Sequence, residues 1–262
     1  MLAPQLDVPD FLAFAARHGA PGVELRNDVP GLAISGASGL SASELRALLR
    51  RHGLPLLSIN ALQRFNRPTN VLLAEAERLI AFTAAAGGTG VVLCPVNDPA
   101  WTPDPTERDR LLRESLSALL PILRRHGVVG LVEPLGFVEC SLRFKRDAVH
   151  AIDAVDGADT LRLVHDTFHH HVSGETGFFP RHTGLVHVSG VSDPAVPREA
   201  MRDPHRVLVD AADRLGNLEQ LRALRAGGFD GPVSFEPFAA ELRGHPEIDT
   251  LLGASIAHLA TA

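Results

Sequence analysis

Seven short apolar runs recur along the chain and are separated by longer segments of mixed polarity. Each run is almost continuously apolar and does not alternate between apolar and polar positions. Continuous runs of this length are typical of parallel strands that are covered on both faces. We therefore predict seven strands of a parallel sheet, at residues 22–26, 54–60, 90–96, 129–135, 161–168, 183–191 and 231–238.

The segments between these runs have the periodicity of amphipathic helices. The sequence SASELRALLRRHG at 41–53 has a serine N-cap, a glutamate in the first turn, leucines at helical spacing and a closing glycine. The segment at 104–127 repeats this design, and Pro121 is predicted to kink or break its helix. Further helical patterns occupy 7–19, 70–88, 144–157 and 217–229.

Strands that alternate with helices imply a parallel sheet with right-handed crossovers, and eight such units close a (β/α)8 TIM barrel. The chain is one strand short, because the six residues MLAPQL before the first helical pattern cannot form both a strand and its loop. We predict an α/β protein with the TIM-barrel fold whose first strand is missing or vestigial, as would follow if the true N-terminus lay upstream. Residues 1–262 should form a single domain, since α/β barrels of about 250 residues commonly do.

Composition narrows the classes of partner. A net charge of −6 disfavours a surface that neutralises phosphates, so we expect no nucleic acid. No run approaches the roughly 18 apolar residues of a membrane helix, so we expect no membrane association. Cys94 and Cys140 lie far apart with no secretory leader before them, which favours a reduced, cytoplasmic location. A homodimer stays open, because no apolar stripe marks an interface.

Four of the predicted strands end in residue types that bind divalent metal ions: Glu133, Asp166, His187 and Glu236. The C-terminal ends of the strands meet at one mouth in a parallel barrel, so four such side chains can share one ion. Three carboxylates and one imidazole suit Mn²⁺, Co²⁺, Mg²⁺ or Zn²⁺. Each residue alone is as easily a separately satisfied polar group, but four in register favour one divalent metal ion as cofactor.

At these residues the chain resembles the xylose isomerase-like TIM-barrel superfamily of sugar isomerases and epimerases. The resemblance covers almost the whole chain, and its most specific parts are VEP at 132–134, HDTFHH at 165–170, HVSGV at 187–191 and SFEPF at 234–238. Within the superfamily the chain is most similar to the inosose and keto-sugar isomerases, including 2-keto-myo-inositol isomerase, with hydroxypyruvate isomerases and ketose 3-epimerases as further relatives. The resemblance implies that the four strand-end residues hold the metal and that His169 faces the substrate.

This resemblance implies an isomerase or epimerase of a keto-sugar or inosose, which is the expected small-molecule partner. Such an enzyme removes a proton from the carbon next to a carbonyl, holds the resulting enediolate and returns the proton elsewhere. A divalent ion stabilises an enediolate, and two carboxylates can carry the proton. We expect Glu133 and Glu236 to be both ligands and catalytic proton carriers, while Asp166 and His187 fix the ion.

Further polar residues are candidates for binding the substrate. The segment 201–217 is long and polar, and loops of this length at a barrel mouth often cover the substrate. Its candidates are Arg202, Asp203, His205 and Arg206, although an exposed loop is expected to be charged in any case. Glu24, and Asn60 with Arg64, lie near the ends of two other strands, and Glu24 is as easily a structural partner of Arg26.

Three other functions remain as alternatives. A dehydratase of keto-inositols would need the same metal and base, and the ligand set does not separate it from an isomerase. The endonuclease IV branch uses three zinc ions and requires histidines where this chain has Asn60 and Cys94, although Asp203, Pro204 and His205 are similar to part of its third metal site. A purely binding protein would have no evident use for two paired carboxylates.

No segment indicates a nucleotide cofactor. The GGTG sequence at 87–90 precedes a strand and stops a helix, and the ISGASG sequence at 34–39 carries no lysine and is interpreted as a flexible loop at the mouth. A free keto-sugar or inosose is therefore preferred over a phosphorylated one.

Overall fold

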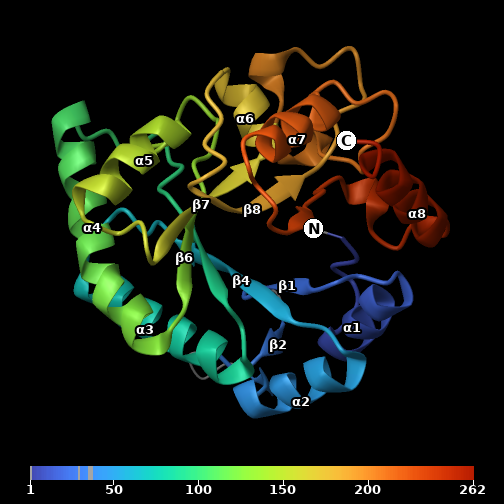
Figure 1. Ribbon diagram of the computed structural model, residues 1–262, viewed down its shortest axis with the longest axis horizontal. Coiled ribbons are helices and arrows are strands. Elements are labelled where there is room, and N and C mark those ends of the chain that lie inside the picture. Colours follow the sequence, from blue (N-terminus) through green and yellow to red (C-terminus); the bar gives the residue numbers. More distant parts are fainter. Residues whose placement is uncertain (1, 29, 35–37) are drawn as a thin grey trace.

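Seven parallel strands form one sheet that curves into a nearly closed barrel (Figure 1). The computed structural model describes residues 2–28, 30–34 and 38–262. In these residues no strand precedes the first barrel strand, so the predicted TIM barrel with a missing or vestigial first strand is confirmed. In their order around the sheet the strands are β1 (Val23–Arg26), β4 (Leu56–Gln63), β5 (Gly90–Cys94), β6 (Val129–Val132), β7 (Leu161–Asp166), β8 (Thr183–Val188) and β9 (Val233–Phe235).

Helices cover the outer face of the sheet (Figure 1). All six predicted helical segments contain a helix, and α6 and α8 occur in addition. None of the helices in the described ranges combines the length and the apolar character needed to cross a bilayer. The helices are α1 (Val8–Arg17), α2 (Ala42–His52), α3 (Asn70–Ala86), α4 (Pro105–His126), α5 (Lys145–Ala154), α6 (Thr167–Ser173), α7 (Asn217–Ala226) and α8 (Ile248–Leu259).

The ends of α2 form as the sequence predicts. The Ser41 side chain accepts a hydrogen bond from the Glu44 amide, the Glu44 side chain accepts one from the Ser41 amide, and Gly53 closes the helix with a φ of 66°. Pro121, by contrast, does not break α4, which continues to His126. Pro121 lies on the exposed side of the helix, where water can bond the carbonyl group that loses its amide partner.

Two short strands, β2 (Gly31–Leu32) and β3 (Gly39–Leu40), pair with each other outside the barrel sheet. They flank the segment 34–39, which the sequence analysis interpreted as a loop at the mouth. Residues 35–37 of that segment lie outside the described residues.

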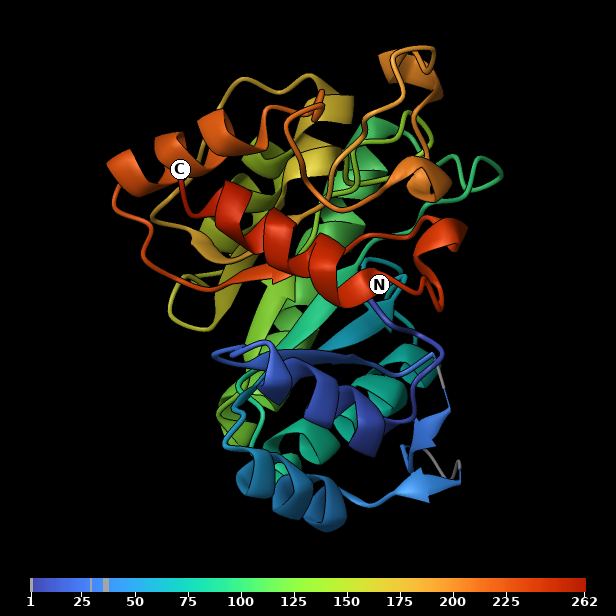
Figure 2. The ribbon, with the colours of Figure 1, turned by 90° about the vertical axis from the view of Figure 1, so that its right-hand side faces the viewer.

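The barrel wall has an opening between β1 and β9, which we call the seam. Of the described strands, β1 pairs only with β4 and β9 only with β8, so the facing edges of β1 and β9 have no strand between them. A cavity of about 390 Å³ lies there. Helices α1 (blue) and α8 (red) flank this side of the barrel in Figure 2 and line the cavity with Phe11, Phe14, Leu252 and Ile256.

Candidate active site

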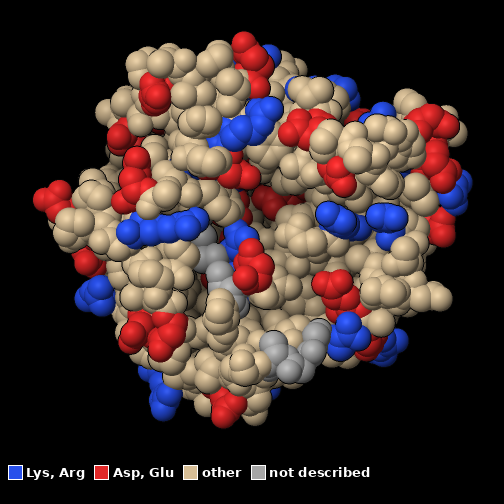
Figure 3. Space-filling view, turned by 180° about the vertical axis from the view of Figure 1, so that it is seen from behind, with Lys and Arg blue, Asp and Glu red and all other residues tan. Residues whose placement is uncertain are grey.

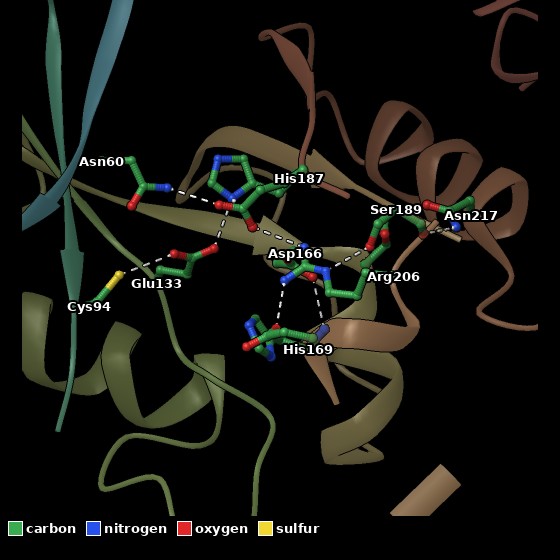
Figure 4. A network of polar contacts seen from close by, with 12 residues as sticks. Asn60, Cys94, Glu133, Asp166, His169, His187, Ser189, Arg206 and Asn217 are labelled. Carbon is green, nitrogen blue, oxygen red and sulfur yellow. Dashed lines mark hydrogen bonds and ion pairs between the residues drawn. The ribbon is translucent and has the colours of Figure 1, made fainter. Parts of the chain in front are cut away.

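The four residues that the sequence analysis assigned to a metal ion lie together at the C-terminal ends of neighbouring strands. Glu133 follows β6, Asp166 ends β7, His187 lies near the end of β8 and Glu236 follows β9. One potential ligand atom from each residue lies within 4.8 Å of the others. Three buried carboxylates and an imidazole at this separation fit a divalent metal ion. Figure 4 shows three of these side chains, Glu133, Asp166 and His187, close together within the network of polar contacts.

His187 is the central residue of this group. Its Nδ1 atom lies 2.8 Å from Oε1 of Glu133 and 3.4 Å from Oε2 of Glu236. On the other side of the ring, Nε2 lies 3.1 Å from Oε1 of Glu24. Burial by itself would lower the pKa of His187, but the carboxylates of Glu236, Glu24 and Glu133 outweigh it and raise the pKa well above its ordinary value.

The carboxylates of the site respond differently to the same surroundings. Burial raises the pKa of Glu133, and the attraction of His187 offsets only part of this rise. Burial also opposes ionisation of Glu236, but His187 and Arg206 together hold its pKa well below the ordinary value. Proximity to two cationic partners therefore favours the charged form of Glu236, whereas burial dominates at Glu133.

Arg206 lies beneath the carboxylates and is only 1% exposed. Its Nη2 atom donates to Oδ2 of Asp166 at 2.5 Å and to Oε2 of Glu236 at 2.9 Å. Its guanidinium carbon lies 4.9 Å from the ring centroids of both Phe168 and Phe238. The sequence predicts Arg206 in a polar loop, whereas in the structure it lies inside the site and connects two of the potential ligands.

The other candidates of the segment 201–217 lie farther out. Arg202 is exposed beside the Phe137 ring, Asp203 is half-exposed at 3.4 Å from Arg206, and Nδ1 of His205 accepts a hydrogen bond from the Arg202 amide. The segment is packed against the barrel, since Met201 and Val209 are buried and Val207 forms a bridge with Gly190. The segment is not a loosely attached flap, because its charged residues are interspersed with apolar residues that are buried against the barrel.

His169 lies at the start of α6, three residues after Asp166, and is buried. The carboxylate of Asp166 caps this helix by accepting a hydrogen bond from the His169 amide at 2.9 Å. The ring packs edge-on against Phe137 and Phe168, and its Nδ1 atom has no hydrogen-bond partner among the described residues. A buried polar atom without a partner is uncommon, and this one is free to bond a ligand or a water molecule.

Two residues of the neighbouring strands contact the same carboxylates. Nδ2 of Asn60, a predicted substrate-binding residue, donates to Oε1 of Glu236 at 3.0 Å, whereas Arg64 is exposed. Sγ of Cys94 donates to Oε2 of Glu133 at 3.5 Å. Cys94 was not among the residues predicted for the site, although its position at the end of β5, in register with the other strand ends, could have indicated it.

The face of the molecule in Figure 3 is hollowed near its centre, and acidic atoms lie at the floor of the hollow. Basic side chains lie around it on the same face. A small polar molecule that enters this hollow would therefore reach carboxylate groups at its floor.

Solved structures are similar to this chain over nearly its whole length. A xylose isomerase domain containing protein (STM4435) from Salmonella typhimurium LT2 is 32% identical, with a TM-score of 0.88 over 98% of this chain and 94% of that chain. The IolI protein, solved with a bound zinc atom, is 21% identical, with a TM-score of 0.83 over 98% and 94%. D-psicose 3-epimerase from Clostridium cellulolyticum H10, solved with D-tagatose, is 16% identical, with a TM-score of 0.72 over 98% and 92%.

The two less similar structures establish the fold alone, and no curated protein sequence matches the chain. The family model described as Xylose isomerase-like TIM barrel, however, matches residues 12–262. This match includes every barrel strand and all four clustered strand-end residues. The resemblance inferred from the sequence motifs is thereby confirmed, and the chain belongs to the xylose isomerase-like TIM-barrel family.

Proposed function

We propose that this protein is a divalent-metal-dependent isomerase or epimerase that acts on a free keto-sugar or inosose. The observation that carries the proposal is the convergence of Glu133, Asp166, His187 and Glu236 within 4.8 Å at the barrel mouth. The zinc atom bound to IolI and the D-tagatose in the structure of D-psicose 3-epimerase, both proteins of the same fold, support it. Both cysteines are free, in keeping with a reducing cytoplasm.

Glu133 and Glu236 are placed to handle the substrate from different sides. They follow β6 and β9, and β7 and β8 lie between these strands in the sheet. In the proposed reaction the ionised Glu236 removes a proton from the carbon next to the substrate carbonyl and keeps it, while a protonated Glu133 donates its own proton at the neighbouring position or on the other face. The two glutamates thereby exchange protonation states in each turnover. A divalent ion held by the four residues would stabilise the negative charge that develops on the substrate oxygens.

Other side chains of the site orient these groups. Asn60 and Arg206 each bond one oxygen of Glu236, which fixes the plane of its carboxylate. Arg206 also favours the ionised form that a general base needs. The unpartnered Nδ1 of His169 would bond a substrate hydroxyl or carbonyl oxygen, while Phe137 and Phe168 keep water from that side. Together these contacts hold a proton acceptor and a substrate-binding group near one point.

A DNA-repair function is less well supported. The additional zinc ions of the endonuclease IV branch require histidines after the strands that correspond to β4 and β5. Asn60 and Cys94 occupy those positions here, and each is already bonded to a carboxylate of the central group.

The Glu236→Gln substitution tests the proposal, because it keeps the shape of the side chain and removes the base. Deuterium exchange from solvent into 2-keto-myo-inositol, D-psicose and related ketoses, followed by NMR with added Mn²⁺ or Zn²⁺, should fall by at least about 100-fold, the lower range of a general-base contribution. Glu241→Gln, an exposed glutamate in the segment that follows, is the matched control and should exchange at the wild-type rate.

Exchange at the wild-type rate by the folded Glu236→Gln protein would refute Glu236 as the base. Release of water from the substrate, instead of an isomer, would assign the same site to a dehydratase. Absence of exchange into any ketose by the metal-loaded wild-type protein would overturn the substrate class.

A further inference from the structure

The carboxylate of Glu24 contacts His187 on the side of the ring that faces away from the other ligands. Nε2 of His187 lies 3.1 Å from Oε1 and 3.3 Å from Oε2 of Glu24. Nδ1 of the same ring faces Glu133 at 2.8 Å and Glu236 at 3.4 Å. Glu24 comes from β1 and His187 from β8, so this contact spans the seam without a backbone ladder.

Glu24 is itself held in place. The hydroxyl of Ser58, on the neighbouring strand β4, donates to its Oε2 atom, and Ser234 of β9 also bonds the carboxylate. A fixed anion next to Nε2 requires that Nε2 carries a proton, because two lone pairs facing each other would repel.

A neutral imidazole has one protonated and one unprotonated nitrogen, and only the unprotonated one can bind a metal ion. If a metal ion takes the place of the proton between Nδ1 and Glu133, the lone pair of Nδ1 faces that ion, while Nε2 keeps the proton that Glu24 accepts. The hydrogen bond to a carboxylate also makes the ring a more basic ligand.

We propose that Glu24 is a positioning residue that fixes the tautomer and orientation of His187, so that Nδ1 is the atom presented to the metal ion. This inference rests on the proposed function. It also revises the sequence-based expectation for Glu24, which becomes a residue that acts on the substrate only through His187.

The test measures Zn²⁺ binding by isothermal titration calorimetry in the wild type and in Glu24→Gln. The substitution should weaken Zn²⁺ binding by about 10-fold to 100-fold, the range found for carboxylates that orient metal-binding histidines. Ser58→Ala removes one support and keeps the charge of Glu24, so its effect should be smaller. The matched control is Glu77→Gln, because Glu77 forms a Glu–His pair at 2.9 Å with His126 on the surface; its Zn²⁺ affinity should equal that of the wild type.

Imidazole ¹⁵N chemical shifts of the Zn²⁺-loaded wild type provide a second readout. His187, assigned by comparison with His187→Asn, should show a protonated Nε2 and a metal-bound Nδ1. Zn²⁺ affinity of Glu24→Gln within twofold of the wild type, or a metal-bound Nε2, would overturn the inference while leaving the metal site intact. A wild-type protein that binds no Zn²⁺ and no Mn²⁺ would overturn the proposed function itself.

Discussion

Arg206 is the main source of fixed positive charge beside the buried carboxylates of the site. It bonds Asp166 and Glu236 directly, and the rings of Phe168 and Phe238 shield it from water. The planar guanidinium suits this place, because it can donate along several directions and stack on aromatic rings at the same time. A lysine would supply the charge without this geometry.

Replacement of Arg206 by Met should lower the free energy of unfolding by about 3 to 5 kcal/mol, because two buried carboxylates lose their cationic partner. Added Zn²⁺ should recover part of this loss if the four residues bind it, since the ion supplies the missing charge. Urea unfolding with and without Zn²⁺ measures both effects.

Arg222→Met, at an exposed position of α7, is the control and should cost no more than about 0.5 kcal/mol. A loss below 1 kcal/mol in Arg206→Met would mean that Arg206 does not stabilise the buried carboxylates of the site.

At the scale of elements, a second buried polar cluster joins α5 and α6. Lys145, the only lysine of the chain, is 4% exposed and lies 3.0 Å from Glu175 and 2.7 Å from Nδ1 of His170. Glu175 also accepts hydrogen bonds from the first amides of α5, where the N-cap residue Phe144 offers no side-chain bond. The carboxylate therefore replaces a missing cap and pairs a buried charge at once.

This cluster makes stability depend on pH. Burial and the nearby Lys145 lower the pKa of His170 to about 4, from 6.5 for an exposed histidine. As the pH falls, His170 therefore becomes protonated in the unfolded chain before it does in the folded protein. The contribution of this cluster to the free energy of unfolding is complete above pH 6.5 and declines between pH 6.5 and about 4. The loss should reach about 3 kcal/mol at the end of this window. His165, whose pKa burial also lowers, acts in the same direction.

Urea unfolding of His170→Gln at intervals between pH 7 and 4.5 tests this prediction. The variant should lose less stability than the wild type over the window, while His150→Gln, at an exposed position of α5, should follow the wild type. Parallel curves for His170→Gln and the wild type would show that another group is responsible.

The success of sequence-based prediction differed between elements for physical reasons. Continuous apolar runs predicted the barrel strands, and amphipathic spacing predicted six helices, because both patterns record which faces are buried. The α6 helix was missed because it has only seven residues and follows β7 without a loop. Asp166 is both the last residue of β7 and the N-cap of α6. In α8 the small residues around Gly253 blur the amphipathic pattern.

The same limit applies to the site. The convergence of Glu133, Asp166, His187 and Glu236 was predictable because parallel strands bring their C-terminal ends together. The burial of Arg206 was not, because its carboxylate partners lie 40 and 30 residues away and the local sequence has the composition of an exposed loop. The contact between Glu24 and His187 joins residues 163 positions apart, which no local pattern reveals.

At the scale of the whole molecule, the seam divides the barrel wall. Near the mouth, side chains link the strands on the two sides of the seam: Asn60 bonds Glu236, Glu24 contacts His187, and Arg26 lies over the ring of Phe238 at 5.3 Å. Elsewhere around the described sheet, neighbouring strands are joined by backbone hydrogen bonds. Side chains of the site therefore join the part of the barrel where no backbone hydrogen bonds link the strands.

The seam also determines where the protein exchanges its amide hydrogens. Successive amides of a strand point to opposite sides, and those of Val23 and Asn27 donate toward β4, so the amides of Glu24 and Arg26 face the cavity. Hydrogen exchange followed by NMR should be faster at these two positions than in β5 and β6, which have a strand on each side. Equal protection would mean that the edges close in solution. If a divalent ion bound at the mouth draws Glu24 and Glu236 together, amide hydrogen exchange in β1 will slow when the ion is added. The exchange rate of these amides will then report on the occupancy of a site that they do not contact.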